Sequence, residues 1–248
     1  MTAIPLVTVA VPSYNQGRYL DDALRSVFQQ DCPVEVFVAD GGSSDESLDV
    51  IKQWEPKLSG WRSHADAGQA AAINECIAKG RAPYVCWLNS DDLLLPGGLA
   101  RLISVLSANP EFPAVYGKAW NLHEDTGKRT PVWTRPFSER WLANACFISQ
   151  PATLIRRSAW ESVVGLDAGL HMAMDYDLWW RLYKVYGVLG FVDEFVAVNR
   201  EHLNTKTRTA RSLHYREAMA VVRKYYGRAP IKWWLAQPYA VWWRTLVK

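Results

Sequence analysis

The stretch that decides the fold reads Tyr84-Val85-Cys86-Trp87-Leu88-Asn89-Ser90-Asp91-Asp92. Its five apolar residues have the length and the side-chain types of a buried β-strand. Four small polar residues follow at once, and two of them are neighbouring carboxylates. Ligands of open α/β sheets bind beyond the carboxyl ends of the strands, so this position is typical of a ligand site. The alternative is that the polar residues only turn the chain and cap a helix.

The adjacent carboxylates of Asp91 and Asp92 point to a cation. Two such groups repel each other at a strand end unless water or a cation compensates their charge. Hard divalent ions such as Mg²⁺ and Mn²⁺ take oxygen ligands and can bridge to phosphate oxygens. A divalent cation that bridges to phosphate is therefore one ligand that this edge would suit, beside the reading as a simple turn.

The composition indicates a globular protein without a general affinity for nucleic acid. The chain has 248 residues, 49% of them hydrophobic, which is ample for one large α/β domain or two small ones. The formal net charge is only +3. The N-terminus lacks the pattern of a signal peptide, and no charge-free apolar stretch approaches the ~18 residues of a spanning helix. Four scattered cysteines form no C-x-x-C pair, so we expect a cytoplasmic protein with free thiols.

Apolar runs and helical spacings alternate through the first ninety residues. Such alternation predicts a parallel sheet with right-handed crossovers. Gly80 is expected to end a helix in the left-handed conformation. The expected strands are 6–11, 34–39, 61–64 and 84–88, and the expected helices are 19–28, 45–54 and 68–79.

Three of these strands are followed by carboxylates, namely Asp40, Asp66 and the group Asn89–Asp92. Because the carboxyl ends of parallel strands meet at one edge of a sheet, we expect these side chains to converge there. Converging carboxylates are costly without a ligand, since like charges disfavour ionisation. A function at this edge is therefore preferred over three unrelated turns.

Several common motifs are absent from the first half of the chain. The first strand is not followed by G-x-G-x-x-G or by G-x-x-x-x-G-K-[ST], which argues against a dinucleotide dehydrogenase and a P-loop NTPase. Residues 41–44 do not match the G-x-S-x-G nucleophile elbow. The loop after the first strand also lacks the glycine- and lysine-rich signature of sugar-nucleotide pyrophosphorylases.

Three ordered motifs resemble those of the inverting family 2 glycosyltransferases of the GT-A fold. They are Val9–Asn15, Ala39–Asp45 and Leu88–Asp92, and Asp66-Ala67-Gly68-Gln69 fits a common subgroup of that family. The resemblance covers about residues 5–210. It implies an α/β, Rossmann-like, mixed but mainly parallel sheet flanked by helices, with a helical C-terminal tail. Residues 1–98 would form a nucleotide-binding half and residues 99–210 an acceptor-binding half of one domain.

The resemblance also assigns roles on the donor side. Asp40 would hydrogen-bond the nucleotide base, and Asp66 with Gly68 would lie beside it. Asn89-Ser90-Asp91 would occupy the family's D-x-D position, with Asn89 in place of the first Asp. Asp91 would be the principal metal ligand, and Asp92 would face the donor sugar. Pro12, Ser13 and Tyr14 would line the base and ribose pocket.

A second informative stretch runs from Met174 to Leu182, where apolar residues recur at helical spacing. The resemblance assigns Asp175 as the general base of an E-D motif, with Met174 in place of the Glu. Asp177 fits a structural role at the start of the helix. An inverting transfer is a single displacement, so one carboxylate must take the proton of the acceptor hydroxyl.

Residues 199–208 are polar, basic and expected to form a loop. A lone histidine is most often an ordinary surface residue. The family often has Arg-x-His here, so the resemblance makes His202 a ligand of the metal or of the diphosphate. Arg200 and Lys206 would add positive charge to the donor site. Residues 121–131 are also polar and are expected to form a loop.

The last segment, residues 211–248, is predicted to be a helical, Trp/Arg-rich tail. Trp and Tyr flanked by Lys and Arg suit a bilayer interface, which would make the protein peripheral on the cytoplasmic face of the inner membrane. The alternative is that these aromatic residues pack on the domain.

Taken with the resemblance, the sequence predicts a glycosyltransferase that depends on Mn²⁺ or Mg²⁺. The expected donor is a UDP-linked hexose or N-acetylhexosamine. The expected acceptor is a saccharide or lipid-linked saccharide in cell-surface polysaccharide or glycolipid biosynthesis, and no nucleic acid is involved. The alternative is a catalytically silent nucleotide-sugar-binding or scaffold module, which the departures at Asn89 and Met174 keep open.

Overall fold

The computed structural model describes residues 3–203 and 205–237. Its first half is the predicted parallel unit, with strand order β3-β2-β1-β4. Ser13 is level with Asp40, and Asp40 is level with Ser63, so three strand ends lie at one edge. The elements are β1 Val7–Ser13, α1 Gly17–Phe28, β2 Val34–Asp40, α2 Ser47–Trp54, a 3₁₀ turn Glu55–Lys57, β3 Gly60–Ser63, α3 Gln69–Lys79 and β4 Tyr84–Trp87.

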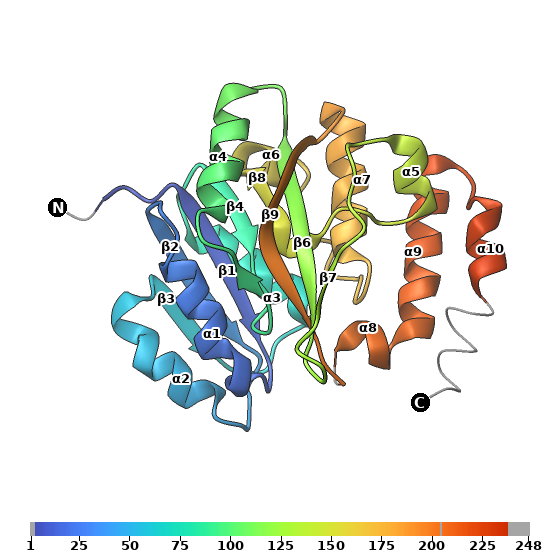
Figure 1. Cartoon of the computed structure of the whole chain (residues 1–248). Helices are drawn as coiled ribbons and strands as arrows, with labels where there is room; N and C mark the ends of the chain where they lie inside the picture. The colour runs from blue at the N-terminus through green and yellow to red at the C-terminus, as the bar shows by residue number, and fades with distance from the viewer. Residues whose placement is uncertain (1–2, 204, 238–248) are drawn as a thin grey trace.

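The second half extends the same sheet through β8, β6, β9 and β5, with β7 paired to β6. β8 is antiparallel to both β4 and β6, whereas β9 runs parallel to β6, so the predicted mixed sheet flanked by helices is confirmed (Figure 1). These elements are β5 Leu93–Leu94, α4 Gly98–Ala108, β6 Ala114–His123, β7 Arg129–Pro131, α5 Glu139–Asn144, a 3₁₀ turn Gln150–Ala152, β8 Thr153–Arg156, α6 Arg157–Ser162, α7 Met174–Tyr186 and β9 Gly190–Glu201.

Three local predictions were wrong. Residues 121–131 are not a loop, because β6 continues to His123 and forms a hairpin with β7. The polar segment from residue 199 begins inside β9, which ends only at Glu201. Gly80 is extended rather than left-handed, and a glycine fits there because a Cβ atom would collide with the side chain of Thr8.

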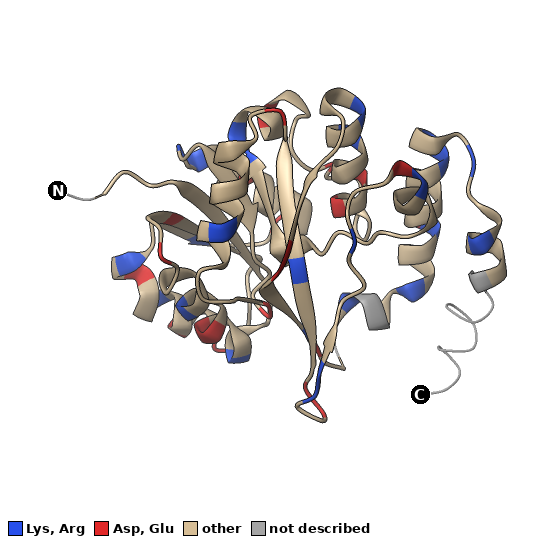
Figure 2. Ribbon diagram, turned by 45° about the horizontal axis from the view of Figure 1, so that its top comes forward, with Lys and Arg blue, Asp and Glu red and all other residues tan. Residues whose placement is uncertain are grey.

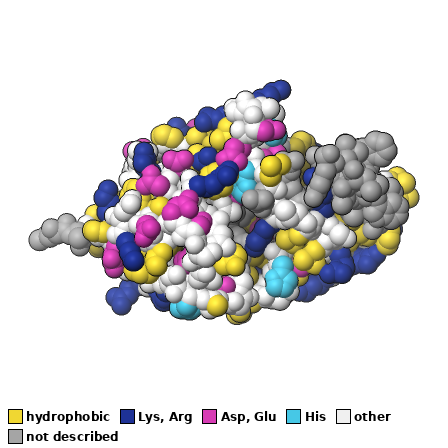
Figure 3. Space-filling model, turned by 90° about the horizontal axis from the view of Figure 1, so that it is seen from below, with side chains coloured by type: hydrophobic (Ala, Val, Ile, Leu, Met, Phe, Trp, Pro, Cys, Tyr) yellow, Lys and Arg dark blue, Asp and Glu magenta, His cyan; other side chains and the backbone are white. Residues whose placement is uncertain are grey.

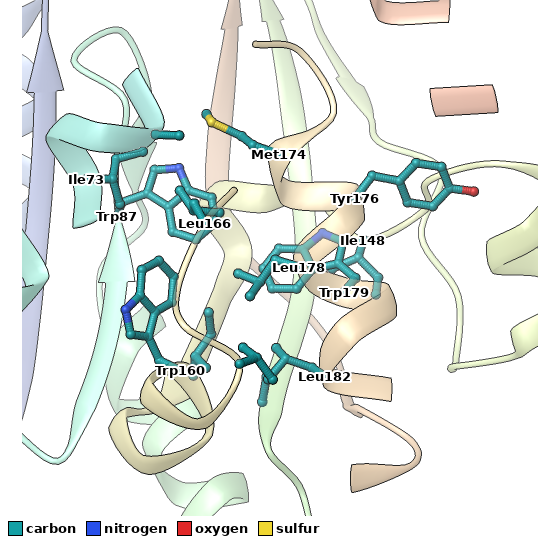
Figure 4. Close-up of a cluster of buried hydrophobic side chains, with 14 of the residues drawn as sticks. Ile73, Trp87, Ile148, Trp160, Leu166, Met174, Tyr176, Leu178, Trp179 and Leu182 are labelled. Atoms are coloured by element: carbon teal, nitrogen blue, oxygen red, sulfur yellow. The ribbon is translucent and has the colours of Figure 1, made fainter. Parts of the chain in front are cut away.

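The sheet is buried on both faces, as expected for parallel strands. Along β1, Val7, Val9 and Val11 pack with α1, α2 and α4 on one face, whereas Ala10 joins the cluster on the other face. This second cluster contains four buried tryptophans, Trp87, Trp160, Trp179 and Trp180, and it packs α7 against the sheet. Three of them, Trp87, Trp160 and Trp179, are labelled in Figure 4. The rings of Trp87 and Trp179 stack with centroids 6.0 Å apart.

The C-terminal helices are α8 Lys206–Thr209, α9 Arg211–Tyr226 and α10 Ile231–Gln237. α9 contributes Ala218, Val221 and Val222 to the same core as α7. Within α10, the indole of Trp233 donates a hydrogen bond to the carbonyl of Ala143 (2.8 Å). Several Lys and Arg residues lie on these helices (Figure 2). In the part of the chain that the structure describes, no helix is long and apolar enough to cross a membrane.

The division of the chain at residue 210 into a domain and a tail stays a prediction. Residues 238–248, which include Trp242 and Trp243 of the predicted tail, lie outside the described residues.

Candidate active site

A pocket of about 590 Å³ opens beyond the carboxyl ends of β1, β2 and β4. Its opposite wall comes from the segment before α7 and from the start of α7 itself. Acidic, basic and histidine side chains gather on the face that holds these strand ends (Figure 3). Ten of the residues predicted at the site line the pocket, namely Pro12, Ser13, Tyr14, Asp66, Gly68, Asn89, Ser90, Asp91, Asp175 and Lys206.

Asp40 is not among the lining residues, although its neighbours Ala39 and Gly41 are. The Asp40 side chain is fully buried, and its Oδ2 accepts hydrogen bonds from the N–H groups of Gly42 (3.0 Å) and Ser43 (2.9 Å). Oδ2 also accepts from the hydroxyl of Ser63 (2.7 Å), on the adjacent strand. Asp40 therefore shapes the loop that forms the pocket wall, and its contact with a nucleotide base stays a prediction.

Asn89 organises the neighbouring polar groups. Its amide nitrogen donates to Oδ2 of Asp92 (3.0 Å) and to Oε1 of Gln150 (3.2 Å). Its carbonyl oxygen accepts from Nε2 of Gln69 (2.7 Å). The amide that replaces the first Asp of the D-x-D motif thus holds Asp92 in place without adding charge.

Asp92 lies behind the pocket surface rather than facing into it. It is 5% exposed, and its Oδ1 accepts a hydrogen bond from the backbone N–H of Arg200 (3.0 Å). Burial raises the pKa of Asp92 well above the usual value, and the adjacent Asp91 carboxylate adds to this rise. A direct contact of Asp92 with a donor sugar stays a prediction.

Asp91 meets His202 at the pocket edge. Oδ2 of Asp91 lies 3.0 Å from Nε2 of His202, and the imidazole packs on the ring of Tyr19 with centroids 4.9 Å apart. The guanidinium of Arg200 covers the same tyrosine ring and donates from Nε to the backbone carbonyl of Asp91 (3.1 Å). Arg200 and His202 therefore support Asp91 from behind, and neither lines the pocket.

The pair of Asp91 and His202 fits a divalent ion that a ligand helps to hold. Residues 3–203 and 205–237 contain no group of three or more His, Cys, Asp or Glu side chains able to bind a metal by themselves. One carboxylate and one imidazole leave coordination positions free for phosphate oxygens. Asp91 faces the pocket, where such oxygens would have access to it.

Asp175 lies in the first turn of α7, on the wall opposite the strand ends. Its Oδ1 accepts a hydrogen bond from the backbone N–H of Tyr176 (2.7 Å). Burial raises the pKa of Asp175, and this hydrogen bond together with the charge of His214 offsets only part of the rise. A carboxylate with a raised pKa is suited to accept a proton.

Sequence motifs missed part of the pocket lining. Gln69 and Gln150, which also line it, had at most a weak signal, and His171 had none. The Lys206 ammonium donates a hydrogen bond to Oε1 of Gln69 (2.7 Å). Desolvation lowers the pKa of Lys206, and the charges of Asp91 and Asp66 offset only part of this fall. The basic character of residues 199–208 is the signal that placed Lys206 on the donor side.

Comparisons with known proteins point to one family of transferases. The family model for glycosyl transferase family 2 matches residues 8–164. A chondroitin synthase of Escherichia coli is 24% identical over 186 residues, which cover 73% of this chain and 27% of that protein. An uncharacterized glycosyltransferase of Rickettsia prowazekii (strain Madrid E) is 26% identical over 216 residues, covering 83% of this chain and 67% of that protein. The chain thus spans about a quarter of the first of these relatives.

Two solved structures share the fold. TarS 1–349 of S. aureus in complex with UDP-GlcNAc superposes with a TM-score of 0.71 at 17% identity, covering 90% of this chain and 67% of that one. Mannosyltransferase PcManGT of Pyrobaculum calidifontis, in complex with GDP-Man and Mn²⁺, gives a TM-score of 0.71 at 19% identity, covering 99% of this chain and 74% of that one. At these identities the likeness establishes the fold alone.

Proposed function

The chain belongs to glycosyl transferase family 2, and from this premise we propose that it transfers a sugar from a UDP-linked donor to an acceptor hydroxyl with inversion. The observation that carries the proposal is that Asp91 and Asp175 line one pocket. Asp91 comes from the end of the parallel sheet, and Asp175 comes from α7 across the pocket. A donor held at the strand ends therefore has a carboxylate on the side from which an acceptor would attack.

The donor side of the pocket binds and orients the nucleotide in this proposal. Pro12, Ser13 and Tyr14 form the wall for base and ribose, and Asp66 with Gly68 closes it. Asp40 acts on the base either directly or by shaping the loop that its side chain holds. The ammonium of Lys206 lines the same pocket and offers positive charge to the diphosphate.

Asp91 and His202 are the proposed ligands of the divalent ion. When bound, the ion neutralises the charge that develops on the leaving diphosphate. The mixed oxygen and nitrogen donor set favours Mn²⁺ over Mg²⁺, because Mg²⁺ prefers oxygen ligands alone. The presence of Mn²⁺ with GDP-Man in PcManGT, which shares the fold, supports this assignment.

Asp175 is the proposed general base. Its carboxylate takes the proton of the acceptor hydroxyl as the oxygen attacks the anomeric carbon, and the bond to the diphosphate breaks in the same displacement. The raised pKa of Asp175 supports this role because a stronger base removes the proton more readily. No covalent sugar intermediate is needed in a single displacement, so no nucleophilic side chain is assigned.

The proposed acceptor is a saccharide or lipid-linked saccharide of a cell-surface polysaccharide or glycolipid. The likeness to a chondroitin synthase and to a hyaluronan synthase supports polysaccharide chemistry. On the C-terminal side, Trp133 and Trp234 are about half exposed, with Lys232 and Arg223 over their rings. Aromatic rings interleaved with cations suit an anionic bilayer, so we propose peripheral contact with the cytoplasmic face of the inner membrane.

The deciding experiment measures donor binding and turnover separately. Purified protein is incubated with UDP-GlcNAc, other UDP sugars and GDP-Man, with and without Mn²⁺. Binding is followed by thermal shift, and release of nucleoside diphosphate is followed by a coupled assay. Mn²⁺-dependent release that Asp175→Asn abolishes supports the transferase. Binding without release by the unaltered protein supports instead the silent binding module.

A further inference from the structure

A carboxylate from α9 holds the segment that leads into α7. Glu217 is only 9% exposed, and it accepts hydrogen bonds from three consecutive backbone amides. The donors are the N–H groups of His171 (3.2 Å), Met172 (2.8 Å) and Ala173 (3.0 Å). The contacts bridge 44 to 46 positions of sequence, so they tie α9 to α7 rather than stabilise a local turn.

This arrangement gives the helix a cap that it cannot make for itself. The first N–H groups of a helix have no partner within the helix, and they carry a partial positive charge. The residue at the N-cap of α7 is Ala173, whose side chain has no acceptor. Glu217 accepts from the N–H of this N-cap residue and from the two amides before it, and it brings a negative charge from a neighbouring helix to the N-terminus of α7.

The held segment is also the acceptor-side wall of the pocket. His171, Met172, Met174 and Asp175 all line it. Asp175 follows two positions after the last amide that Glu217 binds. Within the described residues, its carboxylate accepts a hydrogen bond from the N–H of Tyr176 alone. The direction of the Asp175 side chain therefore depends on the backbone that Glu217 anchors.

We propose that Glu217 is a positioning residue, which fixes the segment 171–173 and so aims Asp175 at the acceptor hydroxyl. The inference rests on the proposed role of Asp175 as the base. The proposal also makes α9 part of the active site. The family model matches residues 8–164, so α9 lies outside the matched region.

The test compares Glu217→Ala and Glu217→Gln with Val222→Ala. Val222 is a fully buried residue of the same helix whose truncation weakens the core and removes no hydrogen bond. The readouts are kcat and donor KM with UDP-GlcNAc and Mn²⁺, and backbone hydrogen exchange of the peptide that contains residues 171–175. A misplaced base lowers the rate of the chemical step, so Glu217→Ala should lose about 10–100-fold in kcat at unchanged donor KM.

Glu217→Gln keeps one acceptor oxygen and should recover part of that loss. Exchange at residues 171–173 should rise in Glu217→Ala and stay at the wild-type level in Val222→Ala. In an Asp175→Asn background, Glu217→Ala should cause no further loss of the residual rate, because the group that it positions is already gone.

Three results would overturn the inference: equal losses of kcat in Glu217→Ala and Val222→Ala at matched stability, unchanged exchange at residues 171–173, or a full additional loss in the Asp175→Asn background. Failure of the proposed function is separable from these. A wild-type protein that turns over no donor refutes the transferase, and the exchange measurement still decides whether Glu217 holds the segment.

Discussion

Nε2 of His202 lies 3.0 Å from Oδ2 of Asp91, although 111 positions of sequence separate the two residues. The strand β9 delivers the histidine to the end of β4, and Tyr19 of α1 packs against its ring. The pairing brings a carboxylate and an imidazole together at the edge of the pocket. It therefore joins the two side chains that we propose as metal ligands.

We predict that His202→Ala weakens the Mn²⁺-dependent part of UDP binding and leaves the metal-independent part nearly unchanged. Loss of a ligand lowers the affinity for the metal, whereas the walls for the base and ribose are untouched. Calorimetry of UDP with and without Mn²⁺ measures both parts. His123→Ala, a histidine paired with Glu201 away from the pocket lining, is the matched control. Equal metal-dependent affinity in His202→Ala and wild type would reject the assignment.

Asp175→Asn should fold normally, bind UDP like the wild type and lose transfer. Asparagine has nearly the same shape but cannot accept the proton, and a general base contributes about 10²–10⁴-fold. The comparison of kcat with the dissociation constant of UDP separates the two effects. Asp177→Asn is an informative contrast, because Asp177 is a buried partner of Arg181 and Tyr225, and its loss should affect stability first. Substantial turnover by Asp175→Asn would refute the base.

The raised pKa of Asp175 has a kinetic consequence with a definite sign. The base works only when it is deprotonated, so kcat should fall as the pH drops through its pKa in the enzyme–substrate complex. Burial places that midpoint above the ordinary aspartate value of about 3.9. A pH profile of kcat at saturating donor measures it, and an acid limb at or below the ordinary value would contradict the prediction.

The raised pKa of Asp175 also means that its ionised form lowers the stability of the folded protein. A carboxyl group whose pKa is higher in the folded than in the unfolded state binds more protons when folded, so its charged form destabilises the fold as the pH rises. Asp175→Asn should therefore melt at least as high as the wild type at pH 7. The difference in melting temperature between this variant and the wild type should shrink as the pH is lowered through the folded-state pKa of Asp175. Thermal melts at several pH values check this, and a large loss of stability at pH 7 would argue against it.

The strand-end residues were predictable because parallel strands fix where their carboxyl ends meet. That rule alone brings Asp66, Asn89 and Asp91 to one edge, and the structure has all three in one pocket. The rule does not give the direction of each side chain. Asp40 turns to the amides of Gly42 and Ser43 in its own loop and to the hydroxyl of Ser63, which lies 23 positions later on the adjacent strand.

Other errors arose where local pattern and tertiary environment differ. The hairpin of β6 and β7 is half exposed, so its strands lack the alternation of apolar residues that marks a buried strand. Glu217 belongs to no motif, since its role depends on amides more than forty positions away. Residues that act through distant backbone groups leave no short-range signal.

Two exposed tryptophans, one in α10 and one beside it, give a prediction for membrane binding. The double variant Trp133→Ala/Trp234→Ala should bind less to anionic vesicles in a flotation assay, because both rings are about half exposed beside cations. Val185→Ser removes an exposed apolar side chain from the C-terminal end of α7 and serves as the control. An unchanged vesicle-bound fraction in the double variant would favour packing of these residues on the protein.

Trp179 gives a prediction for the core beneath the pocket. It is fully buried and stacks on Trp87, which itself lines the pocket, so Trp179→Ala leaves a large cavity and should cost about 3–5 kcal/mol of unfolding free energy. Trp179→Phe should cost much less. Its aromatic ring fills most of the space, and it removes an indole N–H that has no hydrogen-bond partner among the described residues. Urea unfolding of both variants measures the difference. Equal costs for the two substitutions would mean that the indole N–H is satisfied, or that the site collapses around alanine.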